Sequence, residues 1–230
     1  MTFFHTGFCK KLLPLVLLFK LTQAPAQVPV HKEPRHHLVF ENKGIRILNV
    51  LIPPGDTSLY HLHHTPSVFI MLTSTATGSQ LLGGNPSSGT STAGIIYFEN
   101  LAPPHTRTHR VWNADQDTFH VMDIELLSEG KDFTQAPLAL PGLSLVLDTT
   151  GIRAYRLSLL NGSGFMLPPG KQSFVLVSIN TSGIQTIKNG KTREQAVKPG
   201  SFFVIKKAQS FTLKNISNDL AVFYLLEWPG

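Results

Sequence analysis

An internal duplication constrains the fold of this chain more than any other feature of its sequence. Two pairs of segments carry it: LVFENKGIRILNV from Leu38 with LVLDTTGIRAYRL from Leu145, and HRVWNADQDTFHVMDIEL from His109 with FTLKNISNDLAVFYLLEW from Phe211. In the first pair Gly44-Ile45-Arg46 falls on Gly151-Ile152-Arg153 without a gap. Both pairs have nearly the same offset, about one small domain, which indicates two copies of one fold.

The duplication also predicts the domain boundaries. We place a first domain over residues 27–127, a linker over 128–141 and a second domain over 142–230. The linker follows the end of the second repeated segment in the first copy and is rich in residues that interrupt regular structure.

Each copy has the hydrophobic period of β-strands. Within residues 45–51 one set of side chains, starting with Ile45 and Ile47, alternates with a second set that starts with Arg46. Residues 67–72 and 95–98 are short apolar runs, and Gly, Pro, Asn and Ser clusters separate these segments. No long amphipathic helical pattern follows residue 27. We therefore expect an all-β protein of two tandem barrels. A single larger sandwich is the alternative, and the duplication disfavours it.

The first 26 residues have the parts of a secretory signal. Lys10 and Lys11 precede an apolar run over residues 12–21, and the small-x-small triplet Ala24-Pro25-Ala26 ends the segment. A membrane anchor is the other interpretation, but Lys20 interrupts a run that is already short for a spanning helix. We expect an exported protein without a stable membrane anchor, periplasmic or secreted, from a bacterial envelope.

Charge and cysteine content exclude several function classes. Removal of residues 1–26 takes three lysines and no acidic residue, so the net charge falls from +6 to about +3. No dense run of Lys and Arg is present, and we expect no nucleic-acid partner. Cys9, the one cysteine, lies in the signal segment, so the remainder has neither a disulfide nor a thiolate site. The starting motifs of serine hydrolases, P-loop proteins, dinucleotide-binding folds and zincins are missing.

Three histidines form the candidate site. His61 and His63 are two residues apart, so on a strand both imidazoles project to the same face, while His64 faces the other way. His109 lies downstream, on a segment that would have to run beside the first strand. Three neutral imidazoles suit one divalent ion, such as Fe, Mn, Zn, Ni or Cu, with positions left for water or substrate.

The spacing of these residues resembles the motifs of the cupin superfamily. Its first motif, Gly-x5-His-x-His, is matched by Gly55, His61 and His63. Its second, Pro-x-Gly-x-x-His-x-x-x-Asn, is matched by Pro104, His109 and Asn113, with Thr106 in place of the glycine. The resemblance implies two tandem cupin-type barrels, each a double-stranded β-helix or jelly roll, with the metal motifs in the first copy alone.

The sequence departs from the family where a glutamate ligand is expected. That position falls at Ser67 or Val68, so the sphere is reduced to His61, His63 and His109. A three-His site resembles those of thiol, diketone and gentisate-type dioxygenases, which implies ferrous iron and an oxidoreductase acting on a small substrate. A non-catalytic barrel that binds a sugar, a carboxylate or a partner protein remains the alternative. Because cupin barrels often pair through their sheets, a homodimer is also possible.

Further residues are candidates for the site or for structural roles. Gln80 or His105 could complete the sphere, and Tyr60, Arg107 and Trp112 are candidates for the pocket, although period alone does not decide which face they occupy. We interpret His31, His36, His37 and His120 as surface or hydrogen-bonded histidines. Asn113 and Asn215 are interpreted as turn residues, and Glu125 and Glu227 as a pair on edge strands.

The second copy lacks the histidines. When its PPG segment, Pro168 to Gly170, is aligned with the PPG that ends at Gly55, the segment that follows contains no HLHH. Phe211 replaces His109, and Lys206 replaces Pro104. We therefore predict that the second barrel is metal-free and packs against the first.

Overall fold

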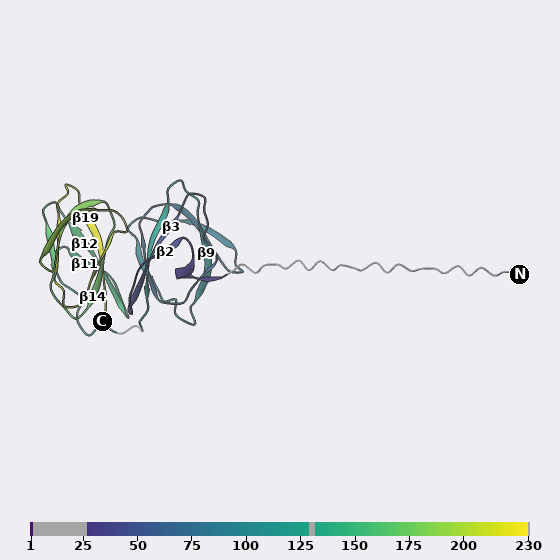
Figure 1. Cartoon of the computed structure of the whole chain (residues 1–230), viewed down its shortest axis with the longest axis horizontal. Coiled ribbons are helices and arrows are strands. Elements are labelled where there is room, and N and C mark those ends of the chain that lie inside the picture. The colour runs from purple at the N-terminus through teal and green to yellow at the C-terminus, as the bar shows by residue number, and fades with distance from the viewer. Residues whose placement is uncertain (2–26, 129–131, 230) are drawn as a thin grey trace.

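A computed structural model describes Met1, residues 27–128 and residues 132–229. The predicted signal segment therefore lies outside the described residues, apart from Met1. The described part forms two lobes side by side, one with β2, β3 and β9, the other with β11, β12, β14 and β19 (Figure 1). Within the described ranges, no helix has the length and apolar character to cross a bilayer.

The first lobe contains two five-stranded sheets and one 3-10 turn, η1 (Val30–Lys32). One sheet has the order β2-β3-β10-β5-β8 and the other the order β1-β4-β9-β6-β7. Their strands are β1 (Val28–Pro29), β2 (His36–Glu41), β3 (Ile45–Ile52), β4 (His61–His63), β5 (Ser67–Met71), β6 (Ala76–Leu81), β7 (Pro86–Thr90), β8 (Ile96–Glu99), β9 (Arg107–Asn113) and β10 (Phe119–Leu126).

The second lobe repeats this arrangement. Its sheets have the orders β11-β12-β19-β14-β17 and β13-β18-β15-β16. The strands are β11 (Leu143–Thr149), β12 (Ile152–Leu159), β13 (Gly164–Leu167), β14 (Ser173–Ser178), β15 (Ser182–Lys188), β16 (Lys191–Val197), β17 (Phe202–Ile205), β18 (Phe211–Asn215) and β19 (Ala221–Trp228). The expected all-β class with two tandem barrels is confirmed.

The two asparagines show how closely the copies correspond. Nδ2 of Asn113 donates to the carbonyls of Ile52 and Asp117, at 2.9 and 2.7 Å. Nδ2 of Asn215 donates to the carbonyls of Leu159 and Asp219 at the same two distances. Both side chains are buried and tie the start of the last strand to the end of an earlier one. These bonds support the interpretation of both asparagines as turn residues.

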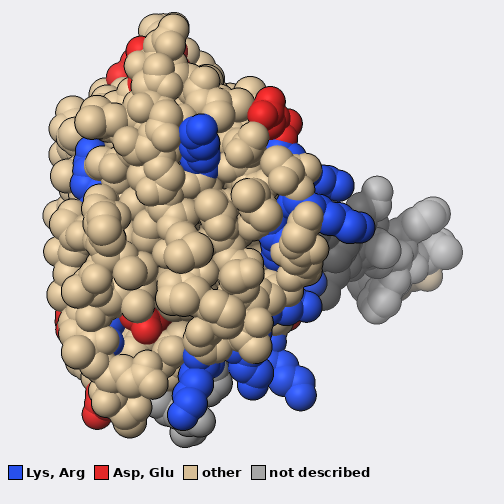
Figure 2. Space-filling view, turned by 90° about the vertical axis from the view of Figure 1, so that its left-hand side faces the viewer, with Lys and Arg blue, Asp and Glu red and all other residues tan. Residues whose placement is uncertain are grey.

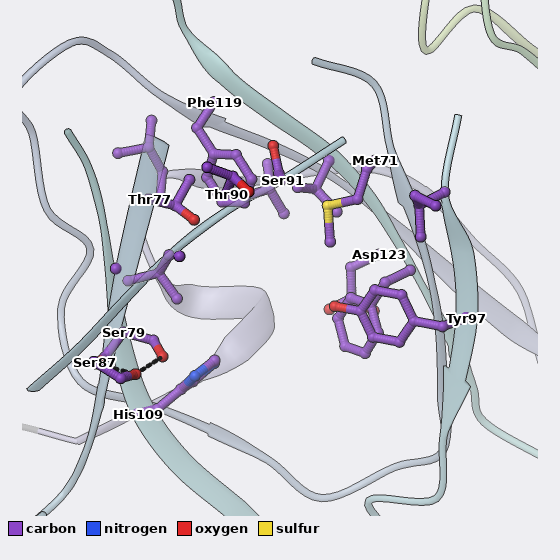
Figure 3. A pocket seen from close by; sticks show the side chains of 18 of the residues that line it. Met71, Thr77, Ser79, Ser87, Thr90, Ser91, Tyr97, His109, Phe119 and Asp123 are labelled. Carbon is purple, nitrogen blue, oxygen red and sulfur yellow. Dashed lines mark hydrogen bonds between the residues drawn. The ribbon is translucent and has the colours of Figure 1, made fainter. Parts of the chain in front are cut away.

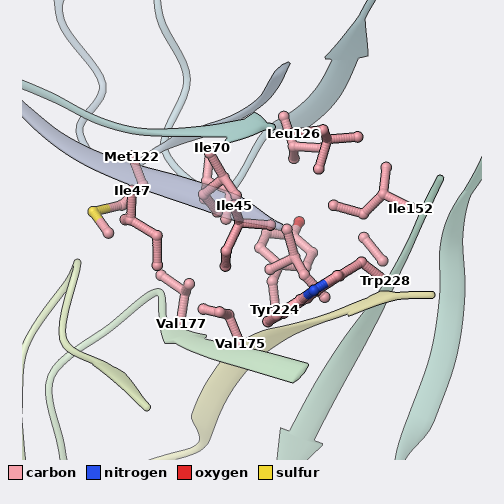
Figure 4. Close-up of a cluster of buried hydrophobic side chains, with 14 of the residues drawn as sticks. Ile45, Ile47, Ile70, Met122, Leu126, Ile152, Val175, Val177, Tyr224 and Trp228 are labelled. Carbon is pink, nitrogen blue, oxygen red and sulfur yellow. The ribbon is translucent and has the colours of Figure 1, made fainter. Parts of the chain in front are cut away.

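Strand alternation gives each barrel two apolar faces. In β3 the side chains of Ile45 and Ile47 point toward the other barrel, whereas those of Val50 and Ile52 face the first barrel's own interior. The outward faces of β3, β5 and β10 pack against those of β12, β14 and β19 in one shared core, and Figure 4 shows the two sets meeting. Each barrel therefore buries the outer apolar face of the other.

The edge-strand interpretation of the two glutamates is wrong. β10 and β19 are the central strands of their sheets, and Glu125 and Glu227 are both buried. Glu125 accepts hydrogen bonds from Arg46 at 2.9 Å and from Thr65 at 2.7 Å, while Glu227 accepts one from the Tyr155 hydroxyl at 2.6 Å. Each carboxyl is paired within its barrel because a buried charge without a partner is costly.

The alignment of the two PPG segments is also wrong. β13 pairs with β18 as β4 pairs with β9, and Leu167, opposite Phe211, takes the place of His61, opposite His109. Phe165, Leu167, Phe211 and Leu213 fill this space as part of the second barrel's core. The strand that carries the histidines is thus kept in the second copy, with apolar side chains in place of its ligands.

Candidate metal centre

Two neighbouring strands bring the three histidines together. β4 and β9 are antiparallel, with His61 opposite His109 and His63 opposite Arg107. His61 and His63 are buried and His109 is half-buried. Their ring centroids lie 4.7–5.1 Å apart. The predicted same-face geometry places all three rings at one end of the barrel interior.

The ring nitrogens are arranged to hold an ion. Nδ1 of His61 lies 2.9 Å from the Leu59 carbonyl, which can only accept, so this nitrogen carries the proton and Nε2 keeps its lone pair. That Nε2 is buried without a hydrogen-bond partner among the described residues. The Nε2 atoms of His63 and His109 are 3.2 Å apart, and one ligand atom from each of the three residues lies within 4.8 Å of the others. This donor set fits one divalent ion.

Burial keeps the imidazoles neutral. It lowers the pKa of His61 to about 4 and that of His109 to about 3, with the neighbouring histidines contributing, and it lowers the pKa of His63 as well. Since a metal ligand must offer a free lone pair, these shifts leave the ring nitrogens available at neutral pH.

Asp123 on β10 stands directly behind the triad. Its Oδ2 lies 3.7 Å from Nδ1 of His63, and neither carboxyl oxygen has a hydrogen-bond partner in the described part of the chain. Complete burial raises the pKa of this carboxyl well above its ordinary value. At 3.7 Å the two groups lie next to each other without a hydrogen bond. Our sequence analysis missed Asp123, although alternation along β10 places it on the inward face with Val121.

His36 is a second residue that the sequence analysis did not assign to the site. Its ring centroid lies 4.5 Å from that of His61, and its Nδ1 lies 2.5 Å from Oε2 of Glu33. Glu33 is buried, and its hydrogen bonds with His36 and two backbone amides lower its pKa against the effect of burial. The expected hydrogen-bonded role of His36 is correct, but the residue also lines the cavity beside the triad.

The triad opens into a cavity of about 470 Å³ within the first barrel. Phe69 and Tyr97 stack at 5.2 Å on one side, next to Asp123. Ser79 and Ser87, whose hydroxyls are 3.3 Å apart, lie across from them near His109 (Figure 3). The cavity therefore has an aromatic side and a hydroxyl-rich side, with the imidazoles at its edge.

Arg107 is the one predicted pocket residue outside the triad that lines the cavity. Along β9, Arg107, His109 and Val111 line the cavity, so their neighbours in sequence face the opposite side. Nη1 of Arg107 lies 2.7 Å from Oε2 of Glu99 on β8. The guanidinium is therefore held by an ion pair at the same edge as His63.

Four other residues that we predicted as pocket residues or extra ligands do not line the cavity. The Gln80 amide oxygen accepts bonds from the Tyr60 hydroxyl at 2.9 Å and from Arg110 at 2.7 Å, on the outer face of the sheet. Trp112 packs on the outer side over Gly78. His105 is exposed in the loop before β9. None of these side chains reaches the triad, because alternation turns the first three outward and the loop carries the last away.

Comparison with known proteins rests on structure. No protein-family model matches the sequence, and no curated protein matches it significantly. Solved structures do match: AerE from Microcystis aeruginosa is 11% identical, with 86% of this chain and 99% of that chain covered at a TM-score of 0.55. Salicylate 1,2-dioxygenase from Pseudaminobacter salicylatoxidans is 11% identical, with 80% and 71% covered at a TM-score of 0.56.

A third match decides the fold. A cupin 2 conserved barrel domain protein from Leptotrichia buccalis is 8% identical, with 84% of this chain and 87% of that chain covered at a TM-score of 0.54. The protein has the bicupin fold. Among the residues that the structure describes, the histidine cluster belongs to the first barrel alone, because apolar side chains fill the equivalent space of the second.

Proposed function

We propose that this bicupin binds one divalent metal ion, with ferrous iron as the first candidate, through His61, His63 and His109, and oxidises a small substrate in the adjoining cavity. The observation that carries the proposal is the convergence of three neutral imidazoles, one of which, His61, has a buried Nε2 with no hydrogen-bond partner among the described residues. When bound, the ion would supply Lewis-acid and redox chemistry.

The chain's own residues prepare the cavity for such a reaction. The Leu59 carbonyl accepts from Nδ1 of His61 and orients its ring, and the Asp123 carboxyl lies behind the ring of His63. The aromatic pair Phe69 and Tyr97 excludes water from one side. Arg107, held by Glu99, offers remaining guanidinium N–H groups to a polar substrate group. The fold shared with salicylate 1,2-dioxygenase is consistent with this chemistry.

Metal content tests the site. Elemental analysis of protein purified without a histidine tag should give about one divalent ion per chain, from the single cluster. His61→Ala and His109→Ala should each abolish stoichiometric binding. His37→Ala, at an exposed position outside the cavity, is the matched control and should retain the ion. Absence of metal from the native protein, or its retention in both cavity variants, would refute the assignment.

A non-catalytic barrel is the second candidate. It is favoured by Ser67 and Val68 at the expected glutamate position, since a sphere of three neutral ligands leaves the ion without a charged partner. Oxygen uptake with a panel of thiols, diketones and aromatic diols separates the two functions. Iron-dependent consumption supports the oxidoreductase, and binding without consumption supports a barrel for a sugar, carboxylate or partner protein.

Export and pairing are also part of the proposal. Because residues 1–26 have the features of a secretory signal, the N-terminus of exported protein should be Gln27, which N-terminal sequencing of the envelope or medium fraction checks. Light scattering on the purified protein tests a homodimer.

A further inference from the structure

The second barrel has a cavity of its own at the end formed by the β15–β16 hairpin. It measures about 420 Å³. Its wall includes Thr186 and Lys188 from β15 and Lys191 and Arg193 from β16, and Phe203 and Phe211 form an aromatic floor. The floor is closed inward by the second barrel's core.

This cavity corresponds in the fold to the mouth of the histidine cavity. Thr186 pairs with Arg193 across β15 and β16 as Ser79 pairs with Ser87 across β6 and β7. Where the first barrel presents the small hydroxyl of Ser87, the second therefore presents the guanidinium of Arg193. The second copy has apolar groups inside where the first has imidazoles, and a cation at the rim where the first has a serine.

The cations around this cavity lack acidic partners. Among the described residues, no carboxylate lies within 4.0 Å of a charged nitrogen of Lys188, Lys191 or Arg193. Glu194, next to Arg193 in sequence, faces the other side and accepts a bond from Gln185 at 2.8 Å. Figure 2, which faces the second lobe, shows Lys and Arg gathered toward one edge of that face.

The Lys188 ammonium is fixed in place despite its cationic surroundings. Its Nζ donates to the Val204 carbonyl at 2.8 Å. Partial burial and the nearby Lys206 lower its pKa. Three cations around one hollow repel one another unless a counter-charge lies between them.

We infer that the mouth of the second barrel binds a small organic anion, with its carboxylate or phosphate groups on Lys188, Lys191 and Arg193 and its apolar part over Phe203. This site is separate from the histidine cluster and goes beyond the proposed oxidation. The fixed ammonium and the guanidinium fork suit an anion with two or more charged oxygens.

Calorimetric titration of the full chain tests the inference, with citrate as the carboxylate probe and pyrophosphate as the phosphate probe. At constant ionic strength set with sodium chloride, at least one probe should bind with one site per chain. The triple variant Lys188→Met, Lys191→Gln, Arg193→Gln should lose at least tenfold in affinity. The probe that binds more tightly identifies the preferred anionic group.

A matched triple variant controls for net charge. Lys43→Gln, Lys171→Gln and Lys214→Gln remove three exposed lysines outside the cavity and should change affinity less than twofold. Arg193→Gln alone, at an exposed position, tests the site if the triple variant does not fold. Binding should persist in His61→Ala, which separates this site from the metal centre. Failure of both probes to bind, or equal losses in the two triple variants, would overturn the inference.

Discussion

The carboxyl group of Asp123 lies 3.7 Å from Nδ1 of His63, and both of its oxygens are buried without hydrogen-bond partners among the residues described. Asp123→Asn keeps the shape but removes the acidic group that lies behind the ring of His63. We expect the metal affinity to fall about 10-fold to 100-fold, the usual effect of losing such a group. Competition against a chelator measures it. Asp117→Asn, on the same loop-strand segment but outside the cavity, should leave the affinity unchanged.

His120 makes the folded state sensitive to acid. Burial lowers its pKa from 6.5 to about 4, and its Nε2 lies 2.6 Å from Oδ1 of Asn49. Between these two pH values the unfolded chain binds the proton more readily, so stability is fully present above about pH 6.5 and falls as the pH is lowered toward 4. His120→Gln should reduce this loss by about 1–2 kcal/mol, a figure discounted for partial exposure.

Urea unfolding of metal-free protein at pH 7 and pH 4.5 measures the effect of His120. The buried triad contributes a loss of the same sign, so part of the acid sensitivity should remain in the variant. An unchanged difference between the two pH values in His120→Gln would contradict the prediction.

At the residue scale, the sequence predicted what depends on spacing within one strand. His61 and His63 share a face because strand side chains alternate, and this needs no knowledge of the fold. Asp123 and His36 reach the same cavity from β10 and β2, through strand pairings between distant segments. No local pattern encodes those registers, so the supporting residues could not be found from spacing alone.

The pairing of β6 with β9 depends on a glycine at one position. A Cβ on Gly78 would lie 2.0 Å from the Trp112 ring, so Gly78→Ala forces the indole away from the sheet. We expect a loss of about 1–3 kcal/mol in the free energy of unfolding. Gly89→Ala on the adjacent β7 has open space at its Cβ and is the matched control. Thermal unfolding of both variants checks the prediction, and equal effects would contradict it.

At the element scale, strand existence was predictable and strand correspondence was not. The hydrophobic period identified β3, β5 and β8, but the repeated PPG misaligned the second copy. β13 has Leu167 where β4 has His61, and β18 has Phe211 where β9 has His109, so residue similarity disappears at the place where the function differs. Only the hydrogen-bonded pairing with β18 identifies its position.

The whole molecule is joined by a core that belongs to both barrels. The side chains of Ile47 and Ile70, on the outer face of the first barrel, share a cluster with those of Val177 and Tyr224 in the second. The Tyr224 hydroxyl also donates to the Gly94 carbonyl of the first barrel at 2.6 Å. Either barrel alone would expose a continuous apolar sheet face to water, which costs free energy in proportion to its area. The predicted packing of the second barrel against the first thus has a thermodynamic reason.

Because of this shared core, the two barrels should unfold in one cooperative transition. The two tryptophans allow a direct test, since Trp112 lies in the first barrel and Trp228 in the second. Trp228→Phe leaves a reporter on the first barrel and Trp112→Phe one on the second. In each variant the fluorescence midpoint in urea should equal its circular dichroism midpoint, because a barrel that loses its partner also loses the burial of its outer face. Ile47→Ser weakens that contact and should lower both midpoints together, whereas separate midpoints in the two reporter variants would mean that the barrels fold independently.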